Sequence, residues 1–322
     1  MDKKSLRIVY MGTPDFAVEP LKKLVEGGYN VVGCITMPDK EAGRGHHIQY
    51  SPVKEYALSQ NIPLLQPVRL KDEQFLADLK AWNADLQIVV AFRMLPEVVW
   101  NMPRLGTFNL HASLLPQYRG AAPINWAVIN GEKETGVTTF FLTHEIDTGK
   151  IILQRRIPIG DNECVGDIHD KLMVLGADLV TETVDLILND KADAQEQKCF
   201  YTNESELKPA PKIFKETCKI DWNQDVHYLH NFVRGLSPYP AAWCELTDPQ
   251  GTTISVKIFE TEIIEANHNQ PIGSFKFDKK FIDIAVQNGY IRIRSLQIPG
   301  KKRLSTEEFL RGYKISDLYK FN

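Results

Sequence analysis

Residues 6–28 have the sequence LRIVYMGTPDFAVEPLKKLVEGG, an apolar run followed by a tight turn and a helical pattern. Gly12 ends the apolar run, and Pro14 and Asp15 suit the first turn of a helix through a fixed φ and the helix dipole. Thr13 is the expected N-cap of that helix. The stretch therefore predicts a buried β-strand that passes through a glycine turn into a helix.

The same alternation continues along the first half of the chain. Apolar runs at 29–36, 86–92 and 106–111 alternate with helical patterns such as the one at 72–83. Alternating strands and helices are typical of βαβ units, which build a parallel sheet with helices on both faces. A helical period then runs from 165 to 188 and is expected to close this domain.

A strand, a glycine turn and a helix also suit a nucleotide-binding domain, because a helix N-terminus can hold a phosphate. The dinucleotide fingerprint needs three glycines in the pattern GxGxxG, and only Gly12 is present here. A nucleotide-binding domain is therefore a minor alternative.

The stretch 189–212, NDKADAQEQKCFYTNESELKPAPK, is polar and ends in two prolines, which is typical of a surface linker. One helical pattern at 225–236 follows, and then short alternating segments separated by the turns DPQG, PIG and QNG. These segments predict a small antiparallel, OB-like β-barrel. We therefore expect a catalytic domain at 1–189, a linker at 190–209 and a barrel domain at 210–322.

The composition is that of an ordinary globular protein. Hydrophobic residues make up 43% of the 322 residues and charged residues 25%, and the five cysteines are scattered without a CxxC pair. No secretory signal and no run of about 20 apolar residues is present. We therefore expect a cytoplasmic protein with no membrane segment, and the histidine spacing predicts no metal site.

The formal net charge of −3 argues against nucleic-acid binding over the whole surface. The charge is uneven, because the part from Ala210 to the end has 16 lysines and arginines against 13 acids, whereas the rest has 22 against 28. The segment 292–303 has no acid and five cations: Arg292, Arg294, Lys301, Lys302 and Arg303. Such a run is more often a solvated face than a binding site.

The segment 106–116, GTFNLHASLLP, carries the first candidate for chemistry. The two-residue period of a strand places Asn109 and His111 on one face and Leu110 on the other. Two polar groups thus meet at the carboxyl end of a parallel strand, where open α/β sheets hold their active sites. Alone, an Asn-x-His pair is as often a structural hydrogen-bonded pair.

A second segment, GVTTFFLTHEIDTGKIILQ at 136–154, predicts two strands joined by a loop that presents Asp147. Asp-Thr-Gly is also common in plain turns. As a partner of His111, the carboxylate would fix the tautomer of the imidazole and take or relay a proton. Asn109 would then donate its amide N–H to an oxygen that gains negative charge.

Ser113 raises the alternative of a Ser-His-Asp hydrolase. A nucleophilic serine generally lies at a sharp turn with oxyanion donors around it, and the chain has no GxSxG elbow. A serine hydrolase is therefore a minor alternative.

Together these motifs resemble the methionyl-tRNA formyltransferases, within the family of 10-formyltetrahydrofolate-dependent formyltransferases. The resemblance extends over nearly the whole chain, through MGTPDFA, PDKEAGRG, SPVK, FNLHASLLPQYRGAAPINWAVINGEKETGVT and GKKRLSTEEFLRG. It implies a Rossmann-like α/β domain followed by a small β-barrel. It also implies formyl transfer from 10-formyltetrahydrofolate, as a co-substrate, to the α-amino group of initiator methionyl-tRNA, without a metal. A monomer is the default expectation.

The resemblance assigns roles to individual residues. It places Asn109, His111 and Asp147 in the catalytic trio. It implies a folate pocket formed by six residues: Ser113, Leu114, Leu115, Pro116, Phe92 and Leu95. It implies tRNA contacts for four cations, of which Arg44 lies in the loop 37–52 and the others near the end of the chain: Lys301, Lys302 and Arg303. A few well-placed cations suffice for phosphate contacts.

The chain departs from the family pattern at two places. His46 and His47 follow the GRG where the family often has Lys or Arg, which predicts pH-dependent tRNA contacts in that loop. Arg93 replaces a small residue before the LP of the pocket segment, which predicts a locally different pocket shape.

Three rival functions remain. The same domain can act on glycinamide ribonucleotide or an amino-sugar nucleotide, but a small acceptor needs no basic barrel domain. A hydrolase that releases formate from the same folate differs only in whether water or an amine accepts the formyl group. A non-catalytic tRNA-binding module would not need Asn109, His111 and Asp147 together.

Overall fold

The computed structural model describes residues 2–42 and 47–322. The chain divides into two compact units. The first comprises Met1–Pro123, Thr135–Ile157 and His169–Pro209, and the second comprises Ile124–Glu134, Pro158–Ile168 and Ala210–Asn322. The second unit therefore takes in two segments that precede the polar stretch in the sequence.

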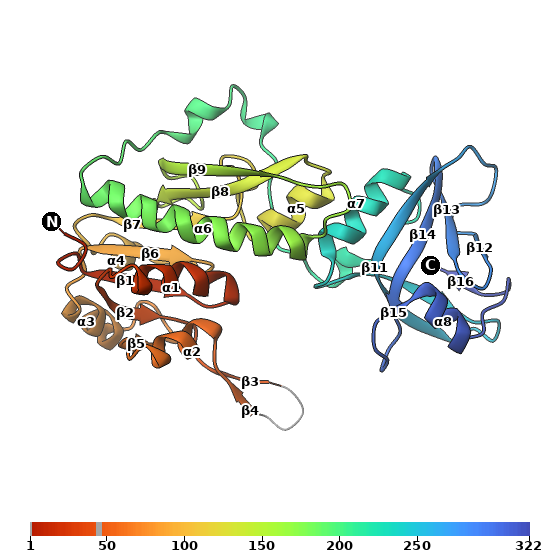
Figure 1. The fold of residues 1–322 in the computed structure, drawn as a ribbon, viewed down its shortest axis with the longest axis horizontal. Helices are drawn as coiled ribbons and strands as arrows, with labels where there is room; N and C mark the ends of the chain where they lie inside the picture. Colours follow the sequence, from red (N-terminus) through yellow and green to blue (C-terminus); the bar gives the residue numbers. More distant parts are fainter. Residues whose placement is uncertain (1, 43–46) are drawn as a thin grey trace. The chain divides into compact units, whose positions relative to one another are not determined.

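A seven-stranded sheet forms the first unit, in the order β5-β2-β1-β6-β7-β8-β9 (Figure 1). The strands are β1 (Ile8–Gly12), β2 (Val31–Ile35), β5 (Leu64–Leu65), β6 (Leu86–Val90), β7 (Thr107–His111), β8 (Glu134–Phe141) and β9 (Ile151–Pro158). Pairing is parallel from β5 to β7 and antiparallel between β7 and β8. The predicted parallel-rich sheet is confirmed, and the parallel strands bring their carboxyl ends to one edge.

Helices cover both faces of this sheet. They are α1 (Val18–Glu26), α2 (Pro52–Ser59), α3 (Glu73–Ala81), α4 (Glu97–Trp100) and α6 (Val165–Leu188), the last of which confirms the predicted long helix. Gly176 of α6 lies against Leu110, since a Cβ added there would meet Leu110 Cδ2 at 2.7 Å. Helix α6 therefore packs on the Leu110 face of β7.

The opposite face of the sheet carries its own hydrophobic core. Val89 and Met11 pack there with Phe75 and Leu79 of α3. Asn109 is the in-register partner of Val89 in the β6–β7 pair, so it lies on the same face. The predicted alternation along β7 therefore holds, with Asn109 turned away from α6.

The turn after β1 differs from its prediction. A 3-10 helix, η1 (Asp15–Ala17), follows Pro14 without a side-chain cap, so the prediction of Thr13 as N-cap was wrong. Asp15 instead accepts a hydrogen bond from the N–H of Phe16 at 2.9 Å, which satisfies a donor that a cap would have taken. Gly12 is required, because a Cβ there would meet the Cβ of Ala17 at 2.6 Å.

An antiparallel sheet in the order β12-β13-β14-β11-β10-β16, with β15 paired to β14, forms most of the second unit. Its strands are β10 (Ala242–Thr247), β11 (Thr253–Glu265), β12 (Phe275–Phe277), β13 (Ile282–Val286), β14 (Gly289–Gln297), β15 (Leu304–Ser305) and β16 (Lys320–Phe321). The helices are α5 (Pro123–Ile129), α7 (Val226–Leu236), α8 (Thr306–Gly312) and the 3-10 helix η4 (Glu216–Cys218). The predicted antiparallel barrel is confirmed, and α7 packs its buried side, including Leu229 and Val233, into the barrel core.

Four short elements complete the described chain. Strands β3 (Lys40–Ala42) and β4 (His47–Gln49) pair with each other in an antiparallel hairpin. The polar stretch holds two 3-10 helices, η2 (Gln197–Phe200) and η3 (Glu204–Glu206). Over the described residues, no helix combines the length and apolarity needed to cross a bilayer.

Candidate active site

His111 ends β7 and is held by the turn that follows. The residue is 6% exposed, and Nε2 lies 2.9 Å from the main-chain oxygen of Tyr118. A carbonyl oxygen only accepts hydrogen bonds, so Nε2 carries the proton in this contact. Nδ1 is consequently the nitrogen that remains available for chemistry.

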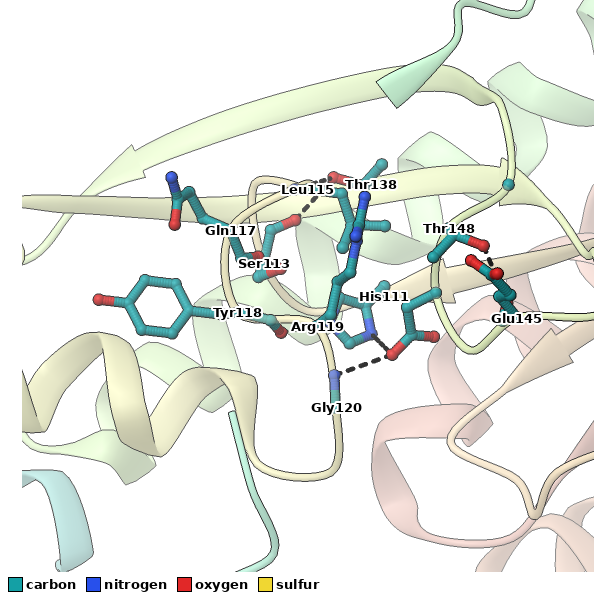
Figure 2. Close-up of polar contacts among 12 residues, drawn as sticks. His111, Ser113, Leu115, Gln117, Tyr118, Arg119, Gly120, Thr138, Glu145 and Thr148 are labelled. Carbon is teal, nitrogen blue, oxygen red and sulfur yellow. Dashed lines mark hydrogen bonds and ion pairs between the residues drawn. The ribbon is translucent and has the colours of Figure 1, made fainter. Parts of the chain in front are cut away.

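Asp147 lies in the loop between β8 and β9 and faces this nitrogen. Its Oδ2 is 3.9 Å from Nδ1 of His111 and accepts a hydrogen bond from the N–H of Gly120 at 2.9 Å (Figure 2). A separation of 3.9 Å is too long for a hydrogen bond. The pair therefore leaves room for a bridging water or substrate group. The main chain of Asp147 has a φ of +56°, which is uncommon for a non-glycine residue. Such a backbone conformation persists where the surrounding structure holds it.

Asn109 lies on the same strand, half-buried, between Val89 of β6 and Phe140 of β8. Among the residues that the structure describes, its side-chain amide has no hydrogen-bond partner. An unengaged amide at the carboxyl edge of the sheet can donate to the oxygen of a bound molecule. The structure thus brings His111 and Asp147 together and places Asn109 on the same strand face as His111.

The segment Ser113–Pro116 forms an internally bonded loop. The hydroxyl of Ser113, a fully buried residue, donates to the main-chain oxygen of Gln117 at 2.7 Å (Figure 2). Thr138 of β8 donates to the oxygen of Ser113 at 2.7 Å and accepts from the N–H of Leu115 at 3.2 Å. Ser113 therefore shapes the loop, and its hydroxyl does not bond to His111 as a serine nucleophile would.

The other side chains expected in the folate pocket differ in accessibility. Leu115 and Pro116 are buried in the loop, and Leu95 is buried in the core next to α4. Leu114 and Phe92 are half-buried. The buried residues therefore form the support of a pocket wall, while Leu114 and Phe92 retain a surface that a ligand can contact.

Arg93 joins two loops at this edge of the sheet. Its guanidinium donates to the main-chain oxygens of Val68, at 2.9 Å, and Pro67. Burial lowers the pKa of Arg93, and its Nε is buried without a hydrogen-bond partner in the described part of the chain. Arg93, which departs from the family pattern, thus links the main chain at 67–68 to the segment 92–95.

The predicted tRNA-binding cations have different environments. Arg44, like His46, lies outside the described residues. Arg303 pairs with Glu260, donates to Ser295 Oγ at 2.7 Å and lies over the ring of Phe259. Most of the basic run is therefore neutralised from within the barrel, because Arg292 and Arg294 also pair with acids: Asp283 and Glu262. Lys301 and Lys302 are exposed, and within the described residues neither has an acid within 4 Å.

The residues that hold His111 and Asp147 in place were not predicted from the sequence. Residues 118–120 contact both of them, through the carbonyl of Tyr118 and the N–H of Gly120. Gln197, in the stretch expected to be a surface linker, is 3% exposed and contacts the Asp147 loop. The expectation of a surface linker was therefore wrong for Gln197. The local sequence AQEQ at 194–197 has no apolar periodicity that could have indicated a buried residue.

Family models match both parts of the chain. The model described as formyl transferase matches residues 6–184, and the one described as formyl transferase, C-terminal domain, matches residues 212–314. The chain belongs to the formyl transferase family. The protein is therefore a formyltransferase, an enzyme that transfers a one-carbon group.

Relatives of this formyltransferase are similar over their whole length. A protein of Bacteroides thetaiotaomicron named methionyl-tRNA formyltransferase is 68% identical over 325 residues, which covers 100% of both chains. One of the same name from Flavobacterium johnsoniae is 54% identical over 98% of both chains. The match thus includes the barrel domain as well as the catalytic unit.

Solved structures of more distant proteins share the fold of this formyltransferase. The sugar 3N-formyl transferase WlaRD has a TM-score of 0.62 at 18% identity, over 93% of this chain and 100% of that one. HypX from Aquifex aeolicus, in complex with tetrahydrofolic acid, has a TM-score of 0.62 at 19% identity, over 98% of this chain and 51% of that one. At these identities the likeness establishes the fold alone.

Proposed function

We propose that this formyltransferase moves the formyl group of 10-formyltetrahydrofolate to the α-amino group of methionine on initiator methionyl-tRNA. The observation that carries the proposal is that Nδ1 of His111, on the strand that presents Asn109, lies 3.9 Å from Oδ2 of Asp147 in the loop between β8 and β9. The full-length identity of 68% to a protein named methionyl-tRNA formyltransferase supports this choice of acceptor.

The reaction needs one proton to leave the acceptor and one to reach the donor. The neutral methionyl amine attacks the formyl carbon and forms a C–N bond, and the bond from that carbon to N10 of the folate then breaks. The amine loses a proton and N10 gains one, so no net proton is consumed. Asp147 and Nδ1 of His111 lie at the right separation to pass this proton through one bridging group.

The formyl oxygen becomes negative between attack and departure. The free amide of Asn109 donates to it, and a protonated His111 adds positive charge beside it. His111 keeps its hydrogen bond to Tyr118 in both protonation states, because only Nδ1 changes. The ring is therefore held in place while the proton moves, and no covalent enzyme intermediate is needed.

Exposed apolar side chains of the catalytic unit suit the folate donor. Val68, Met94 and Ile146 are 77%, 73% and 62% exposed, on three loops of the catalytic unit. Phe92 adds a half-buried ring. A flat pterin and a benzoyl group can bury such surface, whereas a phosphate cannot. We assign Leu114 and Phe92 to contact the folate, with Ser113, Leu115, Pro116 and Leu95 supporting them.

An acceptor assay tests the proposal. The enzyme is given 10-formyltetrahydrofolate with charged initiator tRNA, elongator methionyl-tRNA or free methionine, and formylated product is measured. We expect the initiator to be formylated fastest by a wide margin. Equal rates on all three acceptors would contradict the tRNA-specific function, and formate release without a formylated acceptor would indicate a hydrolase.

Lys301 and Lys302 are proposed to contact tRNA phosphates, together with Arg44. Replacing both lysines with glutamate is expected to weaken tRNA binding and to flatten its salt dependence, because about two phosphate contacts are lost. Filter binding over a series of salt concentrations measures both quantities. The same change at Lys279 and Lys280, an exposed pair in the same unit, is the control for added negative charge.

Arg303 gives a contrasting result in the same experiment. Because its guanidinium is engaged by Glu260 and Ser295, its replacement is expected to lower the melting temperature of the protein rather than the salt slope of binding.

Unchanged affinity at low salt after reversal of Lys301 and Lys302 would remove this part of the barrel from the tRNA interface.

A further inference from the structure

One residue of the polar stretch 190–209 is buried in the catalytic unit. Gln197 is 3% exposed, although Glu196 and Lys198 on either side of it are exposed. A buried side-chain amide is stable only when its donors and acceptor are satisfied. The contacts of Gln197 therefore explain why the chain turns inward at this position.

Gln197 makes four hydrogen bonds, all near the catalytic acid. Its Nε2 donates to the main-chain oxygens of Asp147 and Gly149 at 2.7 and 2.9 Å. Its Oε1 accepts from Nε and Nη2 of Arg119 at 3.0 and 2.7 Å. Carbonyl oxygens only accept and a guanidinium only donates, so the orientation of the amide is fixed by its partners.

These contacts hold a loop whose backbone is unusual at two positions. Asp147 has a φ of +56°, and Gly149 is so close to Phe141 that a Cβ there would overlap the Phe141 oxygen. Gln197 bonds to the main chain at both of these positions. The carboxylate of Asp147 is separately held by Gly120, the neighbour of Arg119. The side chain and the main chain of the acid are therefore both tied to the turn 119–120.

The backbone next to Gln197 is fixed to the sheet. The N–H and oxygen of Gln195 exchange two hydrogen bonds of 2.8 Å with Ile151 at the start of β9. Lys150 and Glu196 form an ion pair at 3.2 Å. Gln195 thus forms an isolated bridge to β9, and this bridge fixes the main chain two residues before Gln197, where η2 begins.

We propose that Gln197 is a positioning residue for formyl transfer, which holds the main chain of Asp147 so that its carboxylate faces Nδ1 of His111. The inference rests on the proposed function, because it gives Gln197 a part in that reaction. Gln197 itself touches no reacting atom. Its loss should therefore affect the chemical step more than the binding of either substrate.

Three full-length variants test this role with initiator methionyl-tRNA and 10-formyltetrahydrofolate. Gln197→Leu removes all four hydrogen bonds, and we expect kcat to fall by about 10- to 100-fold while both KM values stay within about threefold. Gln197→Glu can still accept from Arg119 but cannot donate to the loop while it is ionised. Its activity relative to the native enzyme should rise at low pH, where a protonated carboxyl regains one donor. Gln195→Leu, which changes an exposed side chain of the same segment, is the control.

A double-mutant cycle shows whether Gln197 acts through Asp147. In an Asp147→Asn background, Gln197→Leu should cost less than about threefold, because the positioned carboxylate is already absent. An equal loss in both backgrounds would overturn the inference, as would an unchanged kcat in a folded Gln197→Leu. If Gln197→Leu does not fold, full native activity of Gln197→Glu at neutral pH would overturn it equally. Failure of the native enzyme to formylate methionyl-tRNA would instead count against the proposed function.

Discussion

Replacing His111 with alanine is expected to lower kcat for formyl transfer by about 10²- to 10⁴-fold, the usual range for loss of a general acid–base group. The KM values for folate and tRNA should change little, because His111 is 6% exposed and offers little surface for binding. A single-turnover measurement, with saturating enzyme in excess over methionyl-tRNA and with saturating folate donor, reports the chemical step directly.

A second substitution separates the two roles of His111. Glutamine can place an N–H near the position of Nε2 and donate to Tyr118, but it cannot carry a proton at neutral pH. His111→Gln should therefore preserve the turn 118–120, seen as an unchanged melting temperature, and remain as slow as the alanine variant. Recovery of kcat to within about tenfold of the native enzyme would mean that His111 supports the turn and does not move protons.

Local patterns in the sequence indicated the three residues that we propose as the catalytic trio. The two-residue period of β7 places Asn109 and His111 on one face, and Asp-Thr-Gly between two strands indicates a loop that presents an acid. Both features depend only on neighbours within a few residues. The same is true of α6, whose helical period is unbroken over 24 residues.

The remaining features depend on contacts between distant parts of the chain. Gln197 meets Asp147 across 50 residues, and Arg303 meets Glu260 across 43. No periodicity or motif encodes such pairs, so a buried glutamine was placed in a surface linker. Similarly, the charge count of segment 292–303 did not reveal that Arg303 is neutralised by Glu260 of β11.

Replacing Asp147 with asparagine is the second change with a large expected effect, and it isolates the charge of this residue. The amide is nearly the same size and its oxygen can still accept from the N–H of Gly120, so the loop should keep its structure. It cannot take a proton from the acceptor amine or balance a protonated His111. We expect kcat to fall by about 10²- to 10⁴-fold, measured in the same single-turnover assay.

The double variant Asp147→Asn with His111→Ala then tests whether the two residues act as one unit. If a proton passes between them through a bridging group, removal of either breaks the relay, and the double variant should be about as slow as the slower single variant. If each residue acted independently on the substrates, the two losses in kcat would multiply. The 3.9 Å separation of Oδ2 and Nδ1 favours the first outcome, because the two groups are close enough for one bridging group to bond to both.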